Sequence, residues 1–213
     1  MNISKTHDHH TIRMATLSDL KQVVVVHQEA FPNFFLTKMG KHFLYAYYKT
    51  VLSYPESIFI VAVDEAEKKI LGFVSGFINN IQYYRYMEQC KRTLLFPTLL
   101  GFLHNPSMIG QIIMNRKRIS GISQQTAESS SQTSELSSIG VLNDTKNTGL
   151  GKTLTTEFIK ISKEKNADHI ILTTDARNND HVNQFYLRQG FELVHTFIQP
   201  PNREMNKYIY HIK

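Results

Sequence analysis

A glycine-containing segment between two apolar stretches constrains the fold of this chain more than any other part. ELSSIGVL, residues 135–142, is apolar and β-rich and predicts a strand. Residues 149–164 predict a helix with one apolar face, formed by Leu150, Leu154, Phe158 and Ile161. Between them, Gly149 and Gly151 lie at the helix N-terminus, where unpaired backbone N–H groups attract anions. The sequence therefore predicts a strand, a phosphate-binding loop and a helix in direct succession.

Two phosphate ligands compete for this loop. Gly151-Lys152-Thr153 matches the end of an ATP-binding P-loop, and residues 169–175 resemble the acidic strand of such proteins. A P-loop needs a further glycine five residues before Gly151, and Lys146 stands there. Only about 60 residues follow the loop, too few for the strand–helix units of a P-loop domain. A pyrophosphate at the helix N-terminus, beside Lys146 and Lys152, is the stronger interpretation.

The chain before residue 80 predicts one strand, two helices and a hairpin. Thr11 to Met14 predicts the strand, and Thr16 or Ser18 can cap the helix that follows. Its buried face comprises Leu20, Val23, Val24, His27 and Phe31. Residues 37–53 predict the second helix, with Phe43, Tyr47 and Val51 spaced four apart. The runs 57–64 and 69–78 predict an antiparallel hairpin.

The rest of the chain predicts an insertion followed by more strands. Residues 80–120 look helical and residues 121–134 are rich in Ser, Thr and Gln, which indicates a mobile stretch. After the loop we expect strands at 168–176, 191–198 and 207–212 and a helix at 179–190. We therefore expect a single domain over 1–213, with 80–134 as a helical and mobile insertion between the third and fourth strands.

Composition narrows the function and the location. The net charge of +6 favours anionic ligands, but the charges are dispersed, so nucleic acid is an unlikely partner. One cysteine, Cys90, leaves no disulfide framework or cysteine-based zinc site and suits a reducing cytosol. No signal peptide or long apolar run is visible, which predicts a cytoplasmic protein without a membrane partner. His7, His9 and His10 read as an exposed terminus, and we expect no metal site.

The loop Lys146-Asn147-Thr148-Gly149-Leu150-Gly151 resembles the acetyl-CoA signature of the GNAT acetyltransferases, Arg/Gln-x-x-Gly-x-Gly/Ala, with lysine as a departure at the first position. NNDHVNQFYLRQGFELV, residues 178–194, is similar to the family's second CoA motif, and residues 11–23 resemble its opening strand and helix. The resemblance covers residues 11–79 and 135–213. It implies an α/β (α+β) fold with a mixed, mostly antiparallel sheet of about seven strands flanked by helices.

The resemblance also implies a reaction. The chain would be an N-acetyltransferase that moves an acetyl group from acetyl-CoA to a small-molecule primary amine, by direct attack through a tetrahedral intermediate. Tyr186 matches the position that protonates the leaving thiolate, and Glu135 is the candidate base. The implied CoA-binding residues are Ile139, Gly140, Val141, Lys146, Asn147, Thr148, Gly149, Leu150, Gly151, Lys152, Asn179, Asn183 and Tyr186. Blander interpretations remain open: Tyr186 as a core aromatic, Glu135 as a solvated edge residue and Asn179 as a helix cap.

The acceptor is the least determined part. The insertion interleaves basic residues with tyrosines, namely Arg85, Lys91, Arg92, Arg116, Lys117 and Arg118 with Tyr83, Tyr84 and Tyr86. That pattern could bind a phosphorylated or nucleotide-activated acceptor, or it could be a solvated face or a homodimer contact. An amino sugar is the leading guess; protein N-termini, polyamines and antibiotics stay open. A non-catalytic acyl-CoA sensor or assembly module of the same fold is the alternative, and nucleic-acid binding a third.

Overall fold

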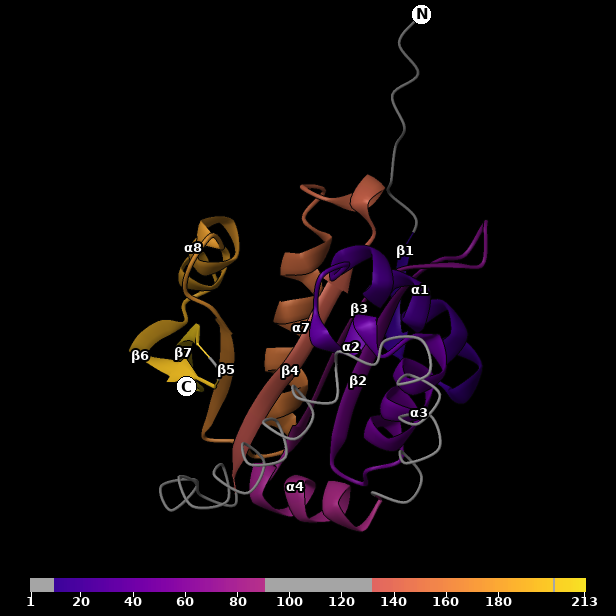
Figure 1. Ribbon diagram of the computed structural model, residues 1–213. Helices are drawn as coiled ribbons and strands as arrows, with labels where there is room; N and C mark the ends of the chain where they lie inside the picture. Colours follow the sequence, from indigo (N-terminus) through magenta and orange to yellow (C-terminus); the bar gives the residue numbers. More distant parts are fainter. Residues whose placement is uncertain (1–9, 91–131, 201) are drawn as a thin grey trace, which may run out of the picture.

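A seven-stranded sheet organises the chain. The computed structural model describes residues 10–90, 132–200 and 202–213 (Figure 1). Within them the strands are β1 (His10–Met14), β2 (Ser57–Asp64), β3 (Lys69–Ile78), β4 (Thr133–Val141), β5 (His169–Asp175), β6 (Glu192–Gln199) and β7 (Arg203–His211). They lie in the order β1-β2-β3-β4-β5-β7-β6, and β4–β5 is the parallel pair among antiparallel ones. The expected mixed, mostly antiparallel sheet is confirmed.

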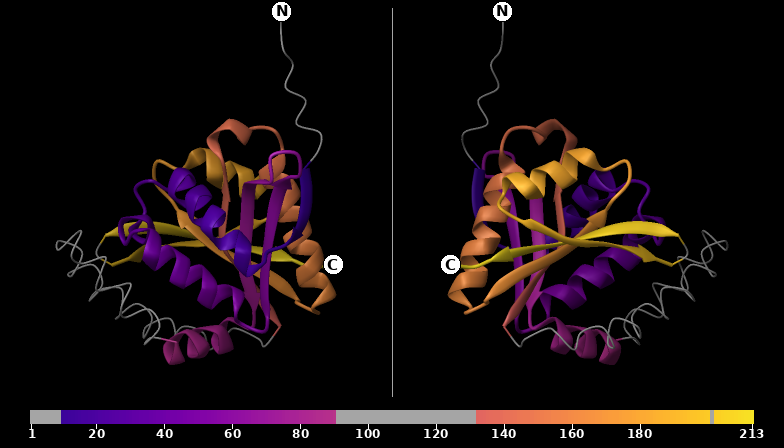
Figure 2. Two further views of the ribbon diagram at one scale, coloured as in Figure 1. Left: turned by 90° about the vertical axis from the view of Figure 1, so that its right-hand side faces the viewer. Right: turned by 90° about the vertical axis from the view of Figure 1, so that its left-hand side faces the viewer.

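Helices cover both faces of the sheet. On one face lie α1 (Leu20–Ala30), α2 (Phe35–Lys38) and α3 (Lys41–Leu52), and on the other lies α7 (Leu150–Glu164) (Figure 2). The remaining helices are α4 (Asn80–Gln89), which follows β3, and α8 (Asp180–Arg188), which follows β5. Short 3-10 turns, η1 (Leu17–Asp19) and η4 (Asn143–Thr145), precede α1 and α7. No helix among these is long and apolar enough to cross a membrane.

The packing of α7 follows the predicted apolar face. Leu150, Leu154 and Phe158 are buried, whereas Ile161 is half-buried. The helix lies so close to the sheet that a Cβ atom on Gly76 would come within 2.6 Å of the Phe158 ring and 2.1 Å of the Glu135 carbonyl oxygen. Contacts this short are sterically forbidden, so the glycine in β3 is required for the approach of α7 and β4.

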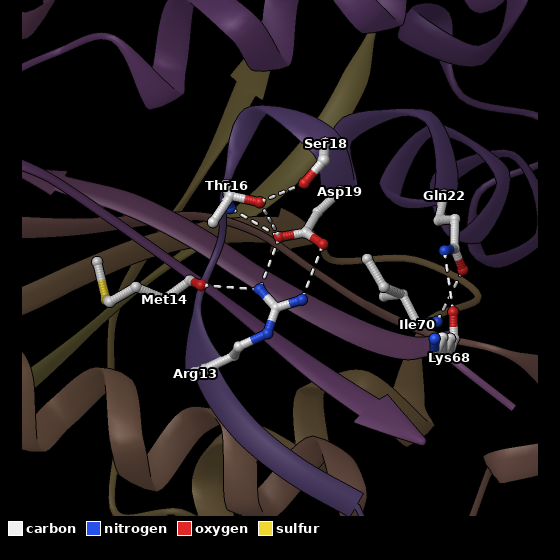
Figure 3. A network of polar contacts seen from close by, with 8 residues as sticks. All are labelled: Arg13, Met14, Thr16, Ser18, Asp19, Gln22, Lys68 and Ile70. Atoms are coloured by element: carbon white, nitrogen blue, oxygen red, sulfur yellow. Dashed lines mark hydrogen bonds and ion pairs between the residues drawn. The ribbon is translucent and has the colours of Figure 1, made fainter. Parts of the chain in front are cut away.

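A polar network joins β1, α1 and the β2–β3 turn (Figure 3). The Arg13 guanidinium donates to both carboxylate oxygens of Asp19, at 2.7 and 2.9 Å, and the Thr16 N–H donates to the same carboxylate at 2.7 Å. The bond from Arg13 lowers the pKa of Asp19 to about 2. The amide of Gln22 bonds the Lys68 carbonyl and the Ile70 N–H, at 3.1 and 2.9 Å. These contacts fix the start of α1 against the first hairpin.

Three elements differ from the sequence prediction. The helix expected over 37–53 breaks into α2 and α3 at Gly40, whose φ of 87° cannot continue a helix. The most buried side chains of α3 are Leu44, Tyr48 and Val51, so Tyr47 is displaced to the edge of the buried face.

Two strands begin earlier than the sequence predicts. β4 begins at Thr133, inside the expected insertion, and β7 begins at Arg203. The start of β7 is polar because side chains there bond those of β5, which apolar periodicity cannot reveal. The rest of the expected insertion, residues 91–131, lies outside the described residues.

His27 is a buried titratable group in the core between α1 and α3. Its Nδ1 atom and the Tyr48 hydroxyl are hydrogen-bonded at 2.7 Å, and its ring packs 4.9 Å from that of Phe31. Burial lowers the pKa of His27 to about 4. The imidazole is therefore neutral in the folded protein at physiological pH.

His27 predicts an acid-dependent loss of stability. Between pH 6.5 and 4 the unfolded chain binds a proton at His27 that the folded protein does not bind. The free energy of unfolding should therefore fall on acidification through this window, by up to about 3 kcal/mol. Urea denaturation at several pH values in this range gives the free energy of unfolding as a function of pH. This pH dependence should be weaker in His27→Gln than in the wild type. It should be unchanged in His195→Gln, because His195 is exposed on β6. An unchanged pH dependence in the His27 variant would contradict this account.

Candidate active site

The centre of the site is the separation of the two parallel strands. β4 and β5 pair only through Thr133–His169, Ser134–Ile170 and Glu135–Ile171. Beyond this point β4 pairs with β3 alone and β5 with β7 alone. The two strands meet near α4 and diverge toward α8 (Figure 1). The backbone groups along this edge of β4 therefore have no neighbouring strand among the described ones.

A β-bulge marks the start of the separation. Ser75 of β3 faces Ser138 and Gly76 faces Leu136, so Ser137 is the extra residue in β4. Bulges bend a strand and re-aim its side chains, and Ser137 is exposed. Beyond the bulge the strand leads through Ile139 to Gly140 and Val141, three predicted CoA-binding residues.

Gly140 lies in a tightly packed part of β4. A Cβ atom there would lie 3.2 Å from the side chains of Ala30 and Phe73 and 3.3 Å from that of Phe31. The C-terminal end of α1 is therefore pressed against β4 on the face opposite α7. Ile139 and Val141 are half-buried. Gly140 itself has no side chain, so it offers only its backbone at this point of β4.

The predicted glycine loop leads directly into α7. Asn147 and Gly149 have left-handed φ values of 64° and 89°, and Gly149 caps the helix. Among the described residues, the N–H groups of Gly149, Leu150, Gly151 and Lys152 have no hydrogen-bond acceptor. These donors share the positive end of the helix dipole. Four unpaired N–H groups on one turn suit a pyrophosphate.

The side chains of the loop leave this turn open. Lys146, Asn147, Thr148 and Lys152 are exposed, and a Cβ atom on Gly149 would meet nothing within 4 Å. The two lysines bring positive charge to the same surface. The loop thus combines backbone donors, positive charge and free space.

Helix α8 lies beside the loop. A Cβ atom on Gly151 would lie 3.7 Å from the Phe185 ring, so α7 and α8 meet at this glycine. Tyr186, the next residue, is buried, and its ring packs near those of Phe191 and Tyr208, at 5.6 and 6.0 Å. Burial raises the pKa of Tyr186, so its phenol keeps its proton at neutral pH. The structure brings the loop and the helix of Tyr186 together.

The two predicted asparagines hold α8 in place. The Asn179 amide donates to Thr174 Oγ1 and the Asp175 carbonyl, at 2.9 and 3.0 Å. The Asn183 amide donates to the carbonyls of Asp175 and Asn179, both at 3.0 Å. Its oxygen accepts from Tyr208 Oη at 2.9 Å and from Asn206 at 3.1 Å. These bonds tie α8 to β5 and β7. A direct role of either asparagine in CoA binding stays a prediction.

Glu135 lies on the other side of the sheet from α7. It occupies the last β4–β5 pair and is half-buried. The Tyr84 hydroxyl of α4 donates to its Oε1 atom at 2.9 Å. The hydroxyl groups of Tyr47 and Ser137 lie 3.4 Å apart next to it along β4. Glu135 and Tyr186 therefore lie on the two strand–helix units that flank the opening, and their direct cooperation stays a prediction.

An aromatic and ionic bridge spans the two diverging strands. The Phe31 ring, which abuts Gly140 of β4, lies 5.1 Å from that of Phe34. The Arg203 guanidinium lies 5.1 Å from the centre of the Phe34 ring and donates to both Asp175 carboxylate oxygens, at 2.5 and 2.7 Å. The chain of contacts runs from β4 to β5 and borders the opening on the side of α1.

Sequence reasoning missed several of these residues. The helical spacing placed Tyr47 on a buried face. No sequence pattern pointed to Phe34 and Arg203, because these two residues contact each other but lie far apart in the chain. The suggested ring-binding role is wrong for Tyr83, which is 3% exposed and stacks on Phe77 at 3.5 Å. Among the described residues no three His, Cys, Asp or Glu side chains gather as a metal site.

Comparison with known proteins assigns the family. The model of the acetyltransferase (GNAT) family matches residues 20–191, so the chain belongs to the GNAT acetyltransferases. By family it is an acyl-CoA-dependent N-acetyltransferase. No curated protein matches the sequence. The family assignment accounts for the fold, the strand separation and the glycine loop together.

Solved structures share the fold at low sequence identity. One is described as a GNAT-family acetyltransferase from Desulfovibrio desulfuricans: 13% identity, 96% of this chain and 100% of that chain covered, TM-score 0.64. The ribosomal-protein-S18-alanine N-acetyltransferase of Escherichia coli is 11% identical, and the match covers 96% of this chain and 95% of that chain with a TM-score of 0.61. The PaiA N-acetyltransferase of Thermoplasma acidophilum, in complex with coenzyme A, is 15% identical, and the match covers 95% of this chain and 99% of that chain with a TM-score of 0.53. At these identities the likeness concerns the fold.

Proposed function

We propose that this chain transfers the acetyl group of acetyl-CoA to the primary amine of a small molecule, and that an amino sugar is the first class to test. The observation that carries the proposal is the opening between β4 and β5, which leads to the unpaired N–H groups of Gly149–Lys152. Acetyl-CoA combines a narrow pantetheine arm with a pyrophosphate, and these two features match the opening and the helix N-terminus. The residues fit this co-substrate.

The donor side of the proposed reaction uses backbone and one phenol. The unpaired edge of β4 around Ile139–Val141 offers N–H groups to the thioester oxygen, on which negative charge develops as the amine attacks. Tyr186, kept protonated by its burial, gives a proton to the leaving sulfur. Lys146 and Lys152 offset the charge of the pyrophosphate.

The acceptor side uses a carboxylate among tyrosines. A primary amine is mostly protonated at neutral pH and must lose a proton before or during attack. Glu135 is the proposed base, directly or through a water. The neighbouring Tyr47 and Ser137 hydroxyl groups offer hydrogen bonds, and tyrosine rings pack well against sugar rings. These features support an amino sugar.

The cofactor assignment predicts that a side chain at Gly149 weakens CoA binding. Valine cannot readily adopt the φ of 89°, so the loop should shift and lose its donor array. Isothermal calorimetry with CoA should show at least about tenfold weaker binding for Gly149→Val. Gly40→Val is the matched control, because Gly40 has a φ of 87° and equally open surroundings but lies at the start of α3. Equal CoA affinity in both variants, or binding of ATP instead, would overturn the assignment.

The proposed role of Tyr186 predicts a kinetic effect without a binding effect. Tyr186→Phe should lower kcat by roughly 100-fold and leave the affinity for acetyl-CoA almost unchanged, because proton donation acts in the transition state. The assay measures CoA thiol release with glucosamine, spermidine, tyramine and a tripeptide with a free N-terminus. Tyr210→Phe, a change on β7 whose ring packs against Phe191, is the control. An unchanged kcat in Tyr186→Phe would remove the phenol from the chemistry. CoA binding without release on any amine would favour the sensor function.

A further inference from the structure

Helix α4 is anchored firmly beneath the site. The Tyr83 ring stacks on Phe77 of β3 at 3.5 Å and contacts Tyr54 edge-on at 5.3 Å. At the helix start, the Asn79 side chain accepts from the Gln82 N–H at 3.2 Å, and the Asn79 N–H donates to the Thr133 carbonyl at 2.9 Å. The first turn of α4 is therefore fixed to both β3 and β4.

This anchor determines where the next side chain points. The Tyr84 ring packs edge-on against Phe77 at 6.1 Å, and its hydroxyl donates to Glu135 Oε1 at 2.9 Å. Tyr84 is only half-buried, so ring packing alone does not explain why a phenol rather than a phenylalanine ring is found here. A hydroxyl donor to a carboxylate stabilises its ionised form and limits its rotation.

Several elements of the described part of the chain meet around Glu135, and Tyr84 of α4 is a hydrogen-bond donor to its carboxylate. α3 contributes Tyr47 and α4 contributes Tyr83, whose phenols face the same region, and β4 contributes Ser137. Ile171 is the residue paired with it on β5, and Phe77 is the residue paired with it on β3. Among the described residues, the neighbours of the carboxylate thus include apolar side chains and neutral hydroxyl groups.

We propose that Tyr84 is a positioning residue for the acetyl transfer: its hydroxyl holds the Glu135 carboxylate ionised and oriented so that it takes the proton of the acceptor amine. This inference rests on the proposed function. It gives the first helix after β3, which the sequence marks only as the start of an insertion, a definite task at the acceptor side. Tyr84 itself transfers no proton.

The test compares Tyr84→Phe with Tyr86→Phe, a change on the same helix whose ring packs against Tyr54. In protein labelled with ¹³C at glutamate Cδ, Tyr84→Phe should raise the titration midpoint of Glu135 by about one pH unit, because the donor to the ionised form is lost. Tyr86→Phe should leave it unchanged. This measurement needs no acceptor. An unmoved midpoint in Tyr84→Phe overturns the proposal.

The kinetic arm asks whether the same bond acts in catalysis. With the amine that releases CoA fastest, the acidic limb of the kcat/KM profile should move to higher pH in Tyr84→Phe by the same amount as the midpoint. In the Glu135→Gln background, Tyr84→Phe should have no further effect. The positioning role is overturned if the titration midpoint of Glu135 moves while the acidic limb of the kcat/KM profile stays in place. It is also overturned if Tyr84→Phe lowers kcat/KM as strongly in the Glu135→Gln background as in the wild type. Wild-type protein that does not bind acetyl-CoA contradicts the proposed function instead.

Discussion

The early end of the β4–β5 pairing is the constraint on which the rest of the site depends. Only three residue pairs join the strands before they diverge. Backbone N–H and C=O groups are strong hydrogen-bonding groups, and within residues 10–90, 132–200 and 202–213 no strand pairs with the edge of β4 beyond Glu135. The bulge at Ser137 and the close packing of Gly140 against α1 keep this edge in place.

The sheet divides the site into two sides with different chemistry. On one side α7 supplies backbone donors and the loop supplies lysines, which suit an anion. On the other side α3 and α4 surround Glu135 with phenols, and the bridge from Phe31 through Phe34 to Arg203 joins the diverging strands. The four hydrogen bonds of Asn183 hold the helix of Tyr186 to β5 and β7. Helix α7 and its loop thus form one side, and helices α3 and α4 form the other.

The donor side was readable from sequence because its determinants are local. Gly149, the apolar face of α7 and the Phe185-Tyr186 motif lie in short segments whose order resembles one family. The proposed acceptor side was not readable, since its contacts join distant segments: Tyr84 with Glu135 and Arg203 with Phe34. The four-residue spacing also put Tyr47 on the buried face of its helix, whereas the most buried side chains of α3 are Leu44, Tyr48 and Val51. Local patterns thus predicted the fold and the loop, whereas the proposed acceptor side depends on tertiary contacts between distant segments.

The most direct test of the account is a titration of ¹⁵N-labelled protein with CoA, followed amide by amide in NMR spectra. The account predicts that the largest shifts fall on the amides of Gly149–Lys152 and of the β4 edge from Leu136 to Val141, since these groups would bond the ligand. Shifts confined to other surfaces, such as the exposed strand β6, or the absence of shifts at saturating CoA, would contradict it.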